Sequence, residues 1–203
     1  MSEIGFQVIP SRKLTDAEVQ ELRDHYLVYA KAERDEHRKL RADLDEIYTR
    51  IDKLFESGAM LRTVTTLYEC DHIVVFATES SILALREFQQ AMLSEGRKVR
   101  LVPEVGGDIN SIRALPENDL LIGVTTSNGF ARRQRERIVA SKAFKVIVTA
   151  SEDPELHAIF DDVFTIGEGS EEGSSLHRIY ATFGVTYFFD RLFAQYARAF
   201  DPE

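Results

Sequence analysis

Hydroxyl side chains gather at three points of the sequence, each directly after a run of apolar residues. Thr78-Glu79-Ser80-Ser81 follows the first run, Thr125-Thr126-Ser127 the second, and Thr149-Ala150-Ser151 the third. Serine and threonine hydroxyls both donate and accept hydrogen bonds, so a group of them suits a hydroxyl-rich or phosphorylated small molecule. A single such cluster at a helix start is usually an ordinary cap. Three clusters at one edge of a sheet predict a polar ligand site.

The second cluster carries the clearest signal, because the sequence changes character abruptly there. Asp119–Val124 is an almost continuous apolar run, typical of a strand covered on both faces. Asn128-Gly129 then permits a sharp turn. The stretch 130–142 contains no Gly or Pro and predicts a helix, on which Arg132 and Arg133 are candidate partners for an anion. In open parallel sheets, ligands bind beyond the carboxyl ends of the strands, where helix N-termini offer N–H groups to anions.

Apolar runs alternate with helical patterns through the rest of the chain. The runs predict strands at His72–Ala77, Lys98–Val102, Asp119–Val124, Lys145–Thr149 and Asp162–Ile166. Helices are predicted at Ala59–Glu69, Ser80–Glu95, Phe130–Lys142, Pro154–Phe160 and Ser174–Phe200, with a weaker one at Asp108–Leu115. This alternation indicates βαβ units and a right-handed parallel sheet. We therefore expect an α/β fold, a three-layer αβα sandwich with a five-stranded parallel sheet in the flavodoxin-like order 2-1-3-4-5.

The first 57 residues predict a helical extension ahead of a domain that spans 58–203. No Gly or Pro occurs from Ser11 to Ser57, and Thr15 with Glu18 has the spacing of a capping box. Two apolar stripes follow at helical spacing, made of Val19, Leu22, Tyr26 and Tyr29, and of Leu40, Leu44, Ile47, Ile51 and Leu54. The charged stretch 31–39 separates them, and the helix is expected to bend, break or cross solvent there. The stripes predict either packing against the body of the domain or a coiled-coil contact with a partner chain.

Composition narrows the class of protein. The 203 residues are 44% hydrophobic and 29% charged, and no apolar run approaches the length that spans a bilayer. The N-terminus lacks the basic and then apolar pattern of a signal peptide. With Cys70 as the single cysteine, no internal disulfide can form, so we expect a cytoplasmic protein without membrane contact. The net charge of −9 argues against a general nucleic-acid binder.

Several stretches match, in order and spacing, the motifs of one protein family. Ala77–Ser81 corresponds to a first loop of the form Gly-x-Gly-x-Ser after a strand, and Thr125–Phe130 to a second loop of the form Ser-x-Ser-Gly-x-Thr. The stretches 145–162 and 176–193 correspond to later passages. From about Leu54 onward, about three quarters of the chain, the sequence resembles the SIS (sugar isomerase) domain. That domain is the phosphosugar-binding fold of sugar-phosphate isomerases and of the C-terminal half of RpiR-type transcriptional regulators.

The resemblance implies which residues hold the ligand. They are Ser80, Ser81, Thr125, Thr126, Ser127 and Asn128, with Glu172 approaching from the late Gly-Ser-Glu loop or from a partner chain. The sequence also departs from the family pattern in both loops. Ala77 and Glu79 replace both glycines of the first loop, and Phe130 stands where the family has a phosphate-binding threonine. An acidic side chain beside a phosphate weakens binding, and one hydroxyl is lost outright.

Catalysis is less well supported than binding. Aldose–ketose isomerisation needs a base that moves a proton between adjacent carbons and a group that assists ring opening, roles that suit Glu and His. Glu172 and His177 are the weak candidates, although an acidic Gly-Ser loop is usually solvated and a histidine at a helix start usually lies at the surface. We expect no catalytic residue, no cofactor and no metal, since His, Cys and carboxylates do not occur at metal-ligand spacing.

The expected function is binding of a sugar phosphate or related carbohydrate derivative by a regulatory or sensor module related to the RpiR-type regulators. The alternatives are a phosphosugar isomerase and a degenerate SIS domain that acts only in protein assembly. The apolar stripes and the aromatic-rich final helix predict a homodimer or tetramer. We expect no DNA binding by this chain, because Ser11–Ser57 holds ten Lys or Arg against twelve Asp or Glu and lacks the glycine-containing turn of a helix-turn-helix.

Overall fold

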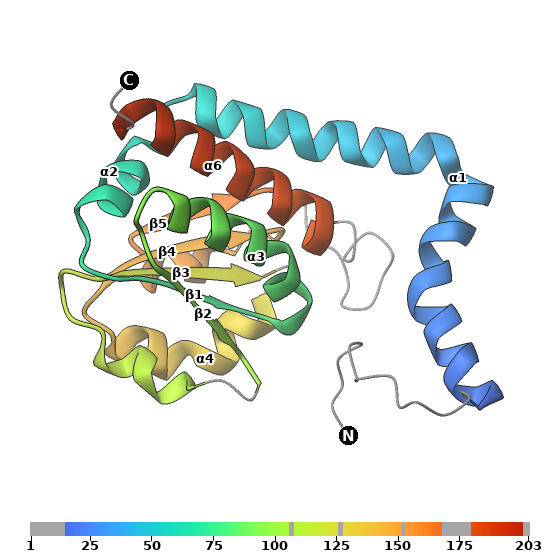
Figure 1. The fold of residues 1–203 in the computed structure, drawn as a ribbon, viewed down its shortest axis with the longest axis horizontal. Helices are drawn as coiled ribbons and strands as arrows, with labels where there is room; N and C mark the ends of the chain where they lie inside the picture. The colour runs from blue at the N-terminus through green and yellow to red at the C-terminus, as the bar shows by residue number, and fades with distance from the viewer. Residues whose placement is uncertain (1–14, 106–107, 126–127, 152, 168–179, 201–203) are drawn as a thin grey trace.

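The computed structural model describes residues 15–105, 108–125, 128–151, 153–167 and 180–200, with side chains described for all of these except 18, 21, 22, 24–40, 128, 180 and 181. Five parallel strands form one sheet (Figure 1). The strands are β1 (Ile73–Ala77), β2 (Val99–Pro103), β3 (Leu120–Thr125), β4 (Phe144–Thr149) and β5 (Asp162–Thr165). Their order is β2-β1-β3-β4-β5, so the predicted α/β fold and flavodoxin-like order are confirmed. Each strand lies within about one residue of its predicted range.

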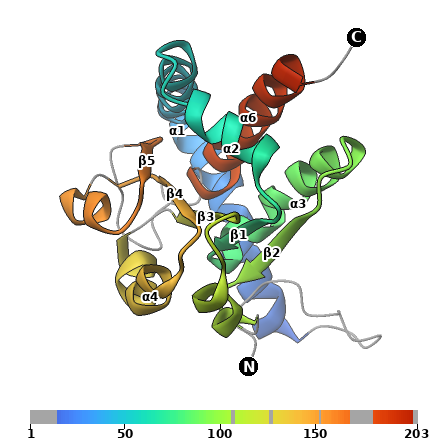
Figure 2. The same ribbon diagram turned by 90° about the vertical axis from the view of Figure 1, so that its left-hand side faces the viewer.

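Helices cover both faces of the sheet (Figure 2). One layer holds α1 (Asp16–Glu56), α2 (Leu61–Glu69), α3 (Glu79–Ser94) and α6 (Val185–Phe200). The other holds α4 (Asn128–Ala140) with the short 3₁₀ helices η1 (Ile109–Ala114) and η2 (Pro154–Ala158). Side chains of β1 alternate between two apolar cores: Val75 faces the first layer, whereas Val74 and Phe76 face the second. Burial on both faces explains why the strands are apolar throughout.

Two predicted helices are shorter and more tightly wound than expected. The stretches 154–160 and 108–115 form the 3₁₀ helices η2 and η1 rather than α-helices. In η2 the carboxylate of Asp153 accepts the N–H of Glu155 at 3.0 Å, and Pro154 opens the helix. A segment this short does not offset the nucleation cost of an α-helix, and 3₁₀ geometry is common in such connectors.

The final helix differs from its predicted range at its start. Residues 174–179 lie outside the described part of the chain. A π-helical turn, η3, covers Tyr180–Gly184, and regular α6 begins at Val185. The buried face of α6 carries Phe188, Phe189 and Tyr196, so the aromatic residues of this helix largely serve the protein's own core.

Helix α1 begins one residue after Thr15, as the capping box predicts, and bends sharply along its length (Figure 1). Its second apolar stripe packs inside the domain, since Ile47 and Ile51 are fully buried in the first core. The hydroxyl of Tyr187 on α6 donates to Asp52 at 2.9 Å and ties the two helices together. For this stripe, packing against the body of the domain is therefore the correct alternative. In the first stripe, the side chains of Leu22, Tyr26 and Tyr29 are outside the described set.

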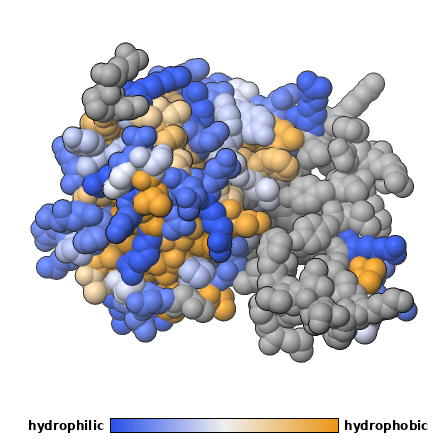
Figure 3. Space-filling model, in the orientation of Figure 1, coloured by the Kyte–Doolittle hydropathy of each residue, from blue (hydrophilic) through white to orange (hydrophobic). Residues whose placement is uncertain are grey.

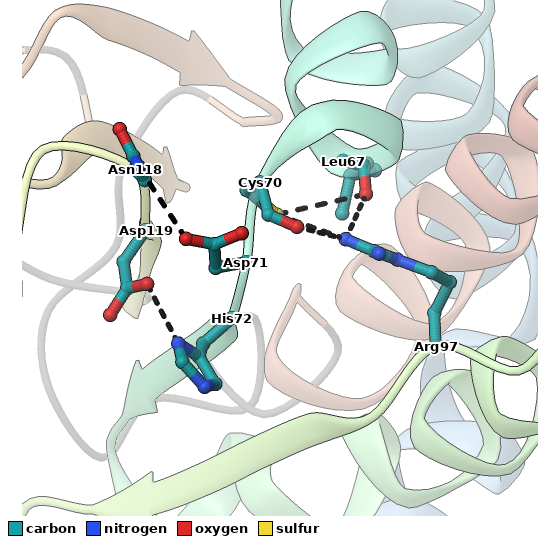
Figure 4. A network of polar contacts seen from close by, with 7 residues as sticks. All are labelled: Leu67, Cys70, Asp71, His72, Arg97, Asn118 and Asp119. Atoms are coloured by element: carbon teal, nitrogen blue, oxygen red, sulfur yellow. Dashed lines mark hydrogen bonds and ion pairs between the residues drawn. The ribbon is translucent and has the colours of Figure 1, made fainter.

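A polar network fastens the amino edge of the sheet (Figure 4). Arg97, between α3 and β2, donates from Nη2 to the backbone carbonyls of Leu67 and Cys70, and so caps the carboxyl end of α2. Burial raises the pKa of the Cys70 thiol above its ordinary value, against the opposing effect of the Arg97 charge. Cys70 is thus buried and held as a thiol, which fits a structural role.

The same network joins the residues that directly precede β1 and β3. His72 Nδ1 lies 2.9 Å from the Oδ1 atom of Asp119, whose side chain is only 4% exposed. Asn118 Nδ2 lies 3.5 Å from the Oδ2 atom of Asp71 (Figure 4), and the backbone N–H of Asp71 donates to the carbonyl of Asn118 at 2.9 Å. The polar groups just before these two neighbouring strands are therefore paired with each other.

The face of the molecule in Figure 3 carries apolar side chains in separate areas among hydrophilic ones. None of the helices in the described ranges is both long and apolar enough to cross a membrane.

Candidate ligand-binding site

The carboxyl ends of β1 and β3 lie side by side at the point where the chain changes layers. Ala77, the last residue of β1, pairs with Val124 of β3. After β1 the chain enters α3 in the first layer, and after β3 it enters α4 in the second. Helix N-termini from opposite layers therefore meet beyond two adjacent strands. This arrangement is the topological switch point at which open α/β sheets bind ligands.

Three hydroxyls of the first loop lie close together at the start of α3. The Oγ1 atom of Thr78 is 3.3 Å from the Oγ atom of Ser80 and 3.4 Å from that of Ser81. Both distances are long for O–H···O hydrogen bonds, which are commonly about 2.7–2.8 Å. Ser80 is exposed, whereas Ser81 is fully buried. The cluster thus has one exposed, one half-buried and one fully buried hydroxyl, and the half-buried hydroxyl of Thr78 is weakly bonded to the other two.

The third loop uses its hydroxyls locally. Thr149 Oγ1 accepts the backbone N–H of Ser151 at 3.1 Å, and lies 3.3 Å from the carbonyl oxygen of the same residue. This is a side-chain turn that closes the loop after β4. Of the three clusters, the one at Thr149 therefore has an ordinary structural explanation.

The second loop is only partly described. Thr125 is buried and pairs with Thr149 at the carboxyl edge. Thr126 and Ser127, the side chain of Asn128, and the late-loop candidates Glu172 and His177 lie outside the described residues. Of the expected site residues, the structure brings Ser80, Ser81 and Thr125 to the same edge of the sheet.

Glu79, which replaces a glycine of the family's first loop, turns toward β2. Its Oε1 atom accepts the backbone N–H of Val105 at 3.3 Å, in the loop after β2. Because β2 and β3 flank β1 on opposite sides, this contact draws the carboxylate away from the β3 side of the switch point.

Phe130, which replaces the family's threonine, belongs to the core beneath the edge. Its ring is fully buried and packs edge-on against Phe76, with ring centroids 4.9 Å apart. At this position the protein therefore has a buried aromatic contact with Phe76 in place of a hydroxyl. The ring of Phe130 does not lie at the surface of the site.

A charged cluster that the sequence reasoning missed lies on the β2 side. Arg133 Nε and Nη2 donate to the two carboxylate oxygens of Glu104 at 2.8 and 2.9 Å, and Gln134 Nε2 donates at 2.9 Å. Burial would raise the pKa of Glu104, but the hydrogen bonds from Arg133 and Gln134 and the charge of Arg133 outweigh it and lower that pKa. The signal in the sequence was the group of arginines at the start of the helix, since guanidinium groups often pair with carboxylates.

The neighbouring arginine is paired on the other side. Arg132 Nη2 lies 3.3 Å from the Oδ2 atom of Asp153, in the loop after β4. The two arginines that the sequence offered as partners for an anion therefore each contact a carboxylate of the protein.

One hollow among the described residues is lined by side chains of α1. It has a volume of about 560 Å³ and runs along α1, lined by Asp45, Glu46, Thr49, Arg50 and Lys53. None of the residues Ser80, Ser81 and Thr125 lines this hollow. Among the side chains that the structure describes, no group of three or more His, Cys, Asp or Glu could hold a metal ion.

Comparison with known proteins rests on structure. No family model matches the sequence, and no curated protein matches it. The sugar isomerase domain of an RpiR transcription factor from Sphaerobacter thermophilus superimposes with a TM-score of 0.63 at 18% identity, covering 78% of this chain and 87% of that one. The chain has the SIS fold.

Two other solved structures share the SIS fold. NanR of Vibrio vulnificus, solved in complex with ManNAc-6P, gives a TM-score of 0.68 at 13% identity over 85% of this chain and 67% of that one. A protein of E. coli CFT073, solved in complex with another sugar phosphate, gives 0.57 at 13% identity over 92% and 93%. Within the SIS fold, the two loops that the sequence motifs marked are those after β1 and β3.

Proposed function

We propose that this chain binds a sugar phosphate or a related carbohydrate derivative at the carboxyl edge of β1 and β3, as a regulatory or sensor module. The ligand's hydroxyl or phosphate oxygens bond to Ser80, Ser81 and Thr125, together with Thr126, Ser127 and Asn128 of the second loop. Glu172 approaches from the late loop or from a partner chain.

One observation carries the proposal: the weakly bonded hydroxyl cluster at the start of α3. Thr78 lies 3.3–3.4 Å from Ser80 and Ser81 at the topological switch point, next to Thr125. Hydroxyls at such separations can be drawn toward a stronger acceptor, such as a phosphate oxygen, with little loss. Two proteins with the same fold, NanR and the E. coli CFT073 protein, were solved as complexes with sugar phosphates.

The departures from the family's loops are compatible with this proposal. Glu79 is held toward the loop after β2, and Phe130 is in the core. The negative charge of Glu79 and the bulk of Phe130 thus lie to the side of and beneath the proposed contacts. Phosphate recognition here relies on hydroxyls and helix N–H groups more than on Arg132 and Arg133, which already contact carboxylates.

A sensor role is preferred to isomerase activity. The carboxylates of Glu79 and Glu104 at this edge accept hydrogen bonds from the protein, and Glu104 is held ionised against Arg133, so neither is poised as a proton-transferring base. An isomerase would depend on Glu172 and His177. The remaining alternative is a degenerate domain that acts only in assembly.

We further propose that the chain acts in the cytoplasm as a homodimer or tetramer and does not itself bind DNA. Residues 1–57 form the extension and 58–203 the ligand-binding domain. The long bent helix α1 provides the extension's surface for a second copy (Figure 1). Sedimentation at micromolar concentration tests the assembly, and a monomer would contradict it. Mobility shifts with genomic fragments at low salt test the absence of specific DNA binding.

A thermal-shift screen of sugar phosphates tests the proposed function. A ligand at a hundred times its dissociation constant stabilises the folded state by about 2.7 kcal/mol. For a protein of this size, that corresponds to an increase of roughly 5–11 °C in Tm. A panel of pentose, hexose and amino-sugar phosphates that includes ManNAc-6P should give at least one such shift, with the unphosphorylated sugars as controls. A panel without any shift would favour the degenerate domain.

A further inference from the structure

The loop that leaves β2 is fastened to both helical layers. Its first residue, Glu104, bonds through its backbone N–H to the carbonyl of Ala77 at 2.9 Å and through its carboxylate to α4 in the second layer. Its second residue, Val105, donates its N–H to Glu79 on α3, in the first layer. Two adjacent residues of one loop thus connect the end of β1 with the starts of the helices that follow β1 and β3.

The contact with α4 is the stronger of the two attachments. The carboxylate of Glu104 is 11% exposed and accepts three charge-assisted or amide hydrogen bonds of 2.8–2.9 Å from Arg133 and Gln134. The contact with Glu79 is a single hydrogen bond of 3.3 Å, donated by the N–H of Val105 to a partly buried carboxylate. Bidentate pairing of an arginine with a carboxylate fixes direction as well as distance. Gln134 is itself held by Arg137, which donates to its Oε1 atom at 2.9 Å.

We infer that Glu104 is a positioning residue for the ligand site: it fixes the loop after β2 against α4 and so sets the β2-side wall of the switch-point site. The inference rests on the proposed function for the identity of the site. Glu104 does not itself contact the ligand. It acts through Val105, whose side chain is 66% exposed beside Glu79, and through the first turns of α4.

Glu104→Gln is the test variant, because it keeps the size of the side chain and removes the charge. Glu136→Gln is the matched control: Glu136 on α4 also pairs with an arginine, Arg113 of η1 at 3.7 Å, but its side chain is 91% exposed and far less constrained. Hydrogen exchange of the full chain, without ligand, directly measures how firmly the loop after β2 is held. Glu104→Gln should speed exchange of the amides of Glu104 and Val105 by about tenfold, the order expected for loss of a charged hydrogen bond. Amides of β4 and β5 should be unaffected in both variants.

Titration with ManNAc-6P provides the functional readout. We expect Glu104→Gln to weaken binding about fivefold or more, with Glu136→Gln unchanged, whereas a purely structural role would lower Tm and leave the affinity of the folded protein unchanged. Unaltered exchange at Glu104 and Val105, or altered exchange spread evenly over the sheet, would overturn the inference. A wild-type protein that binds no sugar phosphate would contradict the proposed function instead, and the exchange result would still decide how the loop is held.

Discussion

The two edges of the sheet use polar residues in opposite ways. At the amino edge, Arg97 caps α2 through two backbone carbonyls and His72 pairs with the buried Asp119 at 2.9 Å. At the carboxyl edge, Thr78 and its two serine neighbours bond to one another only at 3.3–3.4 Å. The charged side chains there, Glu104 and Arg133, bond strongly to each other beside the switch point.

This difference separates structural polar groups from those available to a ligand. A short, charge-assisted contact that joins two elements contributes to stability and changes little when a ligand arrives. A long hydroxyl contact contributes little to stability and can be exchanged for a ligand oxygen. Substitutions at the amino edge should therefore lower stability, whereas substitutions of hydroxyls at the carboxyl edge should lower affinity.

The core beneath the carboxyl edge should be the most sensitive region. Phe130→Thr restores the family's hydroxyl but removes a fully buried ring packed on Phe76. We expect a loss of about 3–5 kcal/mol in the free energy of unfolding, from the cavity and from the buried hydroxyl. Urea unfolding measures it. Val139→Thr, at an exposed position of the same helix, is the control and should lie within about 0.5 kcal/mol of wild type. A Phe130→Thr variant as stable as wild type would contradict the assignment of Phe130 to the core beneath the edge.

Arg97→Met tests the amino edge. The variant keeps much of the apolar stem but removes the donors to the carbonyls of Leu67 and Cys70. Loss of a charged donor from partly buried carbonyls should lower the free energy of unfolding by about 1–3 kcal/mol. Sugar-phosphate affinity should be unchanged. Arg86→Met, an exposed position on α3, serves as the control. If Arg97→Met changed the affinity for the sugar phosphate and left the free energy of unfolding unchanged, the amino edge would serve binding rather than stability, which would contradict the comparison.

The Glu104–Arg133 pair should give a pH-dependent contribution. The pKa of Glu104 is lowered in the folded state, so its ionised form is stabilised above its unfolded pKa of about 4.3, and this stability is lost as pH falls through the lower folded value. Wild type should exceed Glu104→Gln in the free energy of unfolding by about 1 kcal/mol at pH 7, and the difference should shrink as pH falls below the unfolded pKa toward the lower folded pKa. Paired urea titrations from pH 7 to pH 3.5 measure it. A difference that grows on acidification would contradict the assignment.

Ser80→Ala should have the smallest effect on stability. Its hydroxyl is exposed and 3.3 Å from Thr78, so we expect a change within about 0.5 kcal/mol in the free energy of unfolding. The same urea assay applies. A loss above about 1 kcal/mol in the free energy of unfolding would show that the hydroxyl cluster is an ordinary helix cap that stabilises the fold, rather than a group available to a ligand.

The fold could be predicted from the sequence because each strand is buried on both faces. Continuous apolar runs such as Ile73–Ala77 and Leu120–Val124 define strands without reference to distant residues. Helix types in short connectors could not be predicted, since η2 depends on the cap at Asp153 and on packing of Leu156. For the charged stretch between the two apolar stripes, the sequence left open a bend, a break or a passage through solvent, and α1 is continuous and bent (Figure 1).

The site could be predicted only in part. Hydroxyl clusters after β1, β3 and β4 predicted one polar edge of the sheet, and the structure places Ser80, Ser81 and Thr125 at that edge. The sequence could not tell that Thr149 is used in its own turn. The direction of Glu79 and the Glu104–Arg133 pair depend on contacts between residues 26 and 29 positions apart, which local patterns do not encode. Phe130 could be recognised as a departure, but its place in the core required the structure.

The most direct test of the central claim is a calorimetric titration of the double variant Ser81→Ala/Ser127→Ala with the sugar phosphate that gives the largest thermal shift for wild type. If that ligand binds through hydroxyls at the ends of β1 and β3, each lost charge-assisted hydrogen bond should weaken binding by about 1–3 kcal/mol. The unfolding free energy of the ligand-free variant should stay close to that of wild type. Unchanged affinity in the double variant would place the site elsewhere on the molecule and contradict the account.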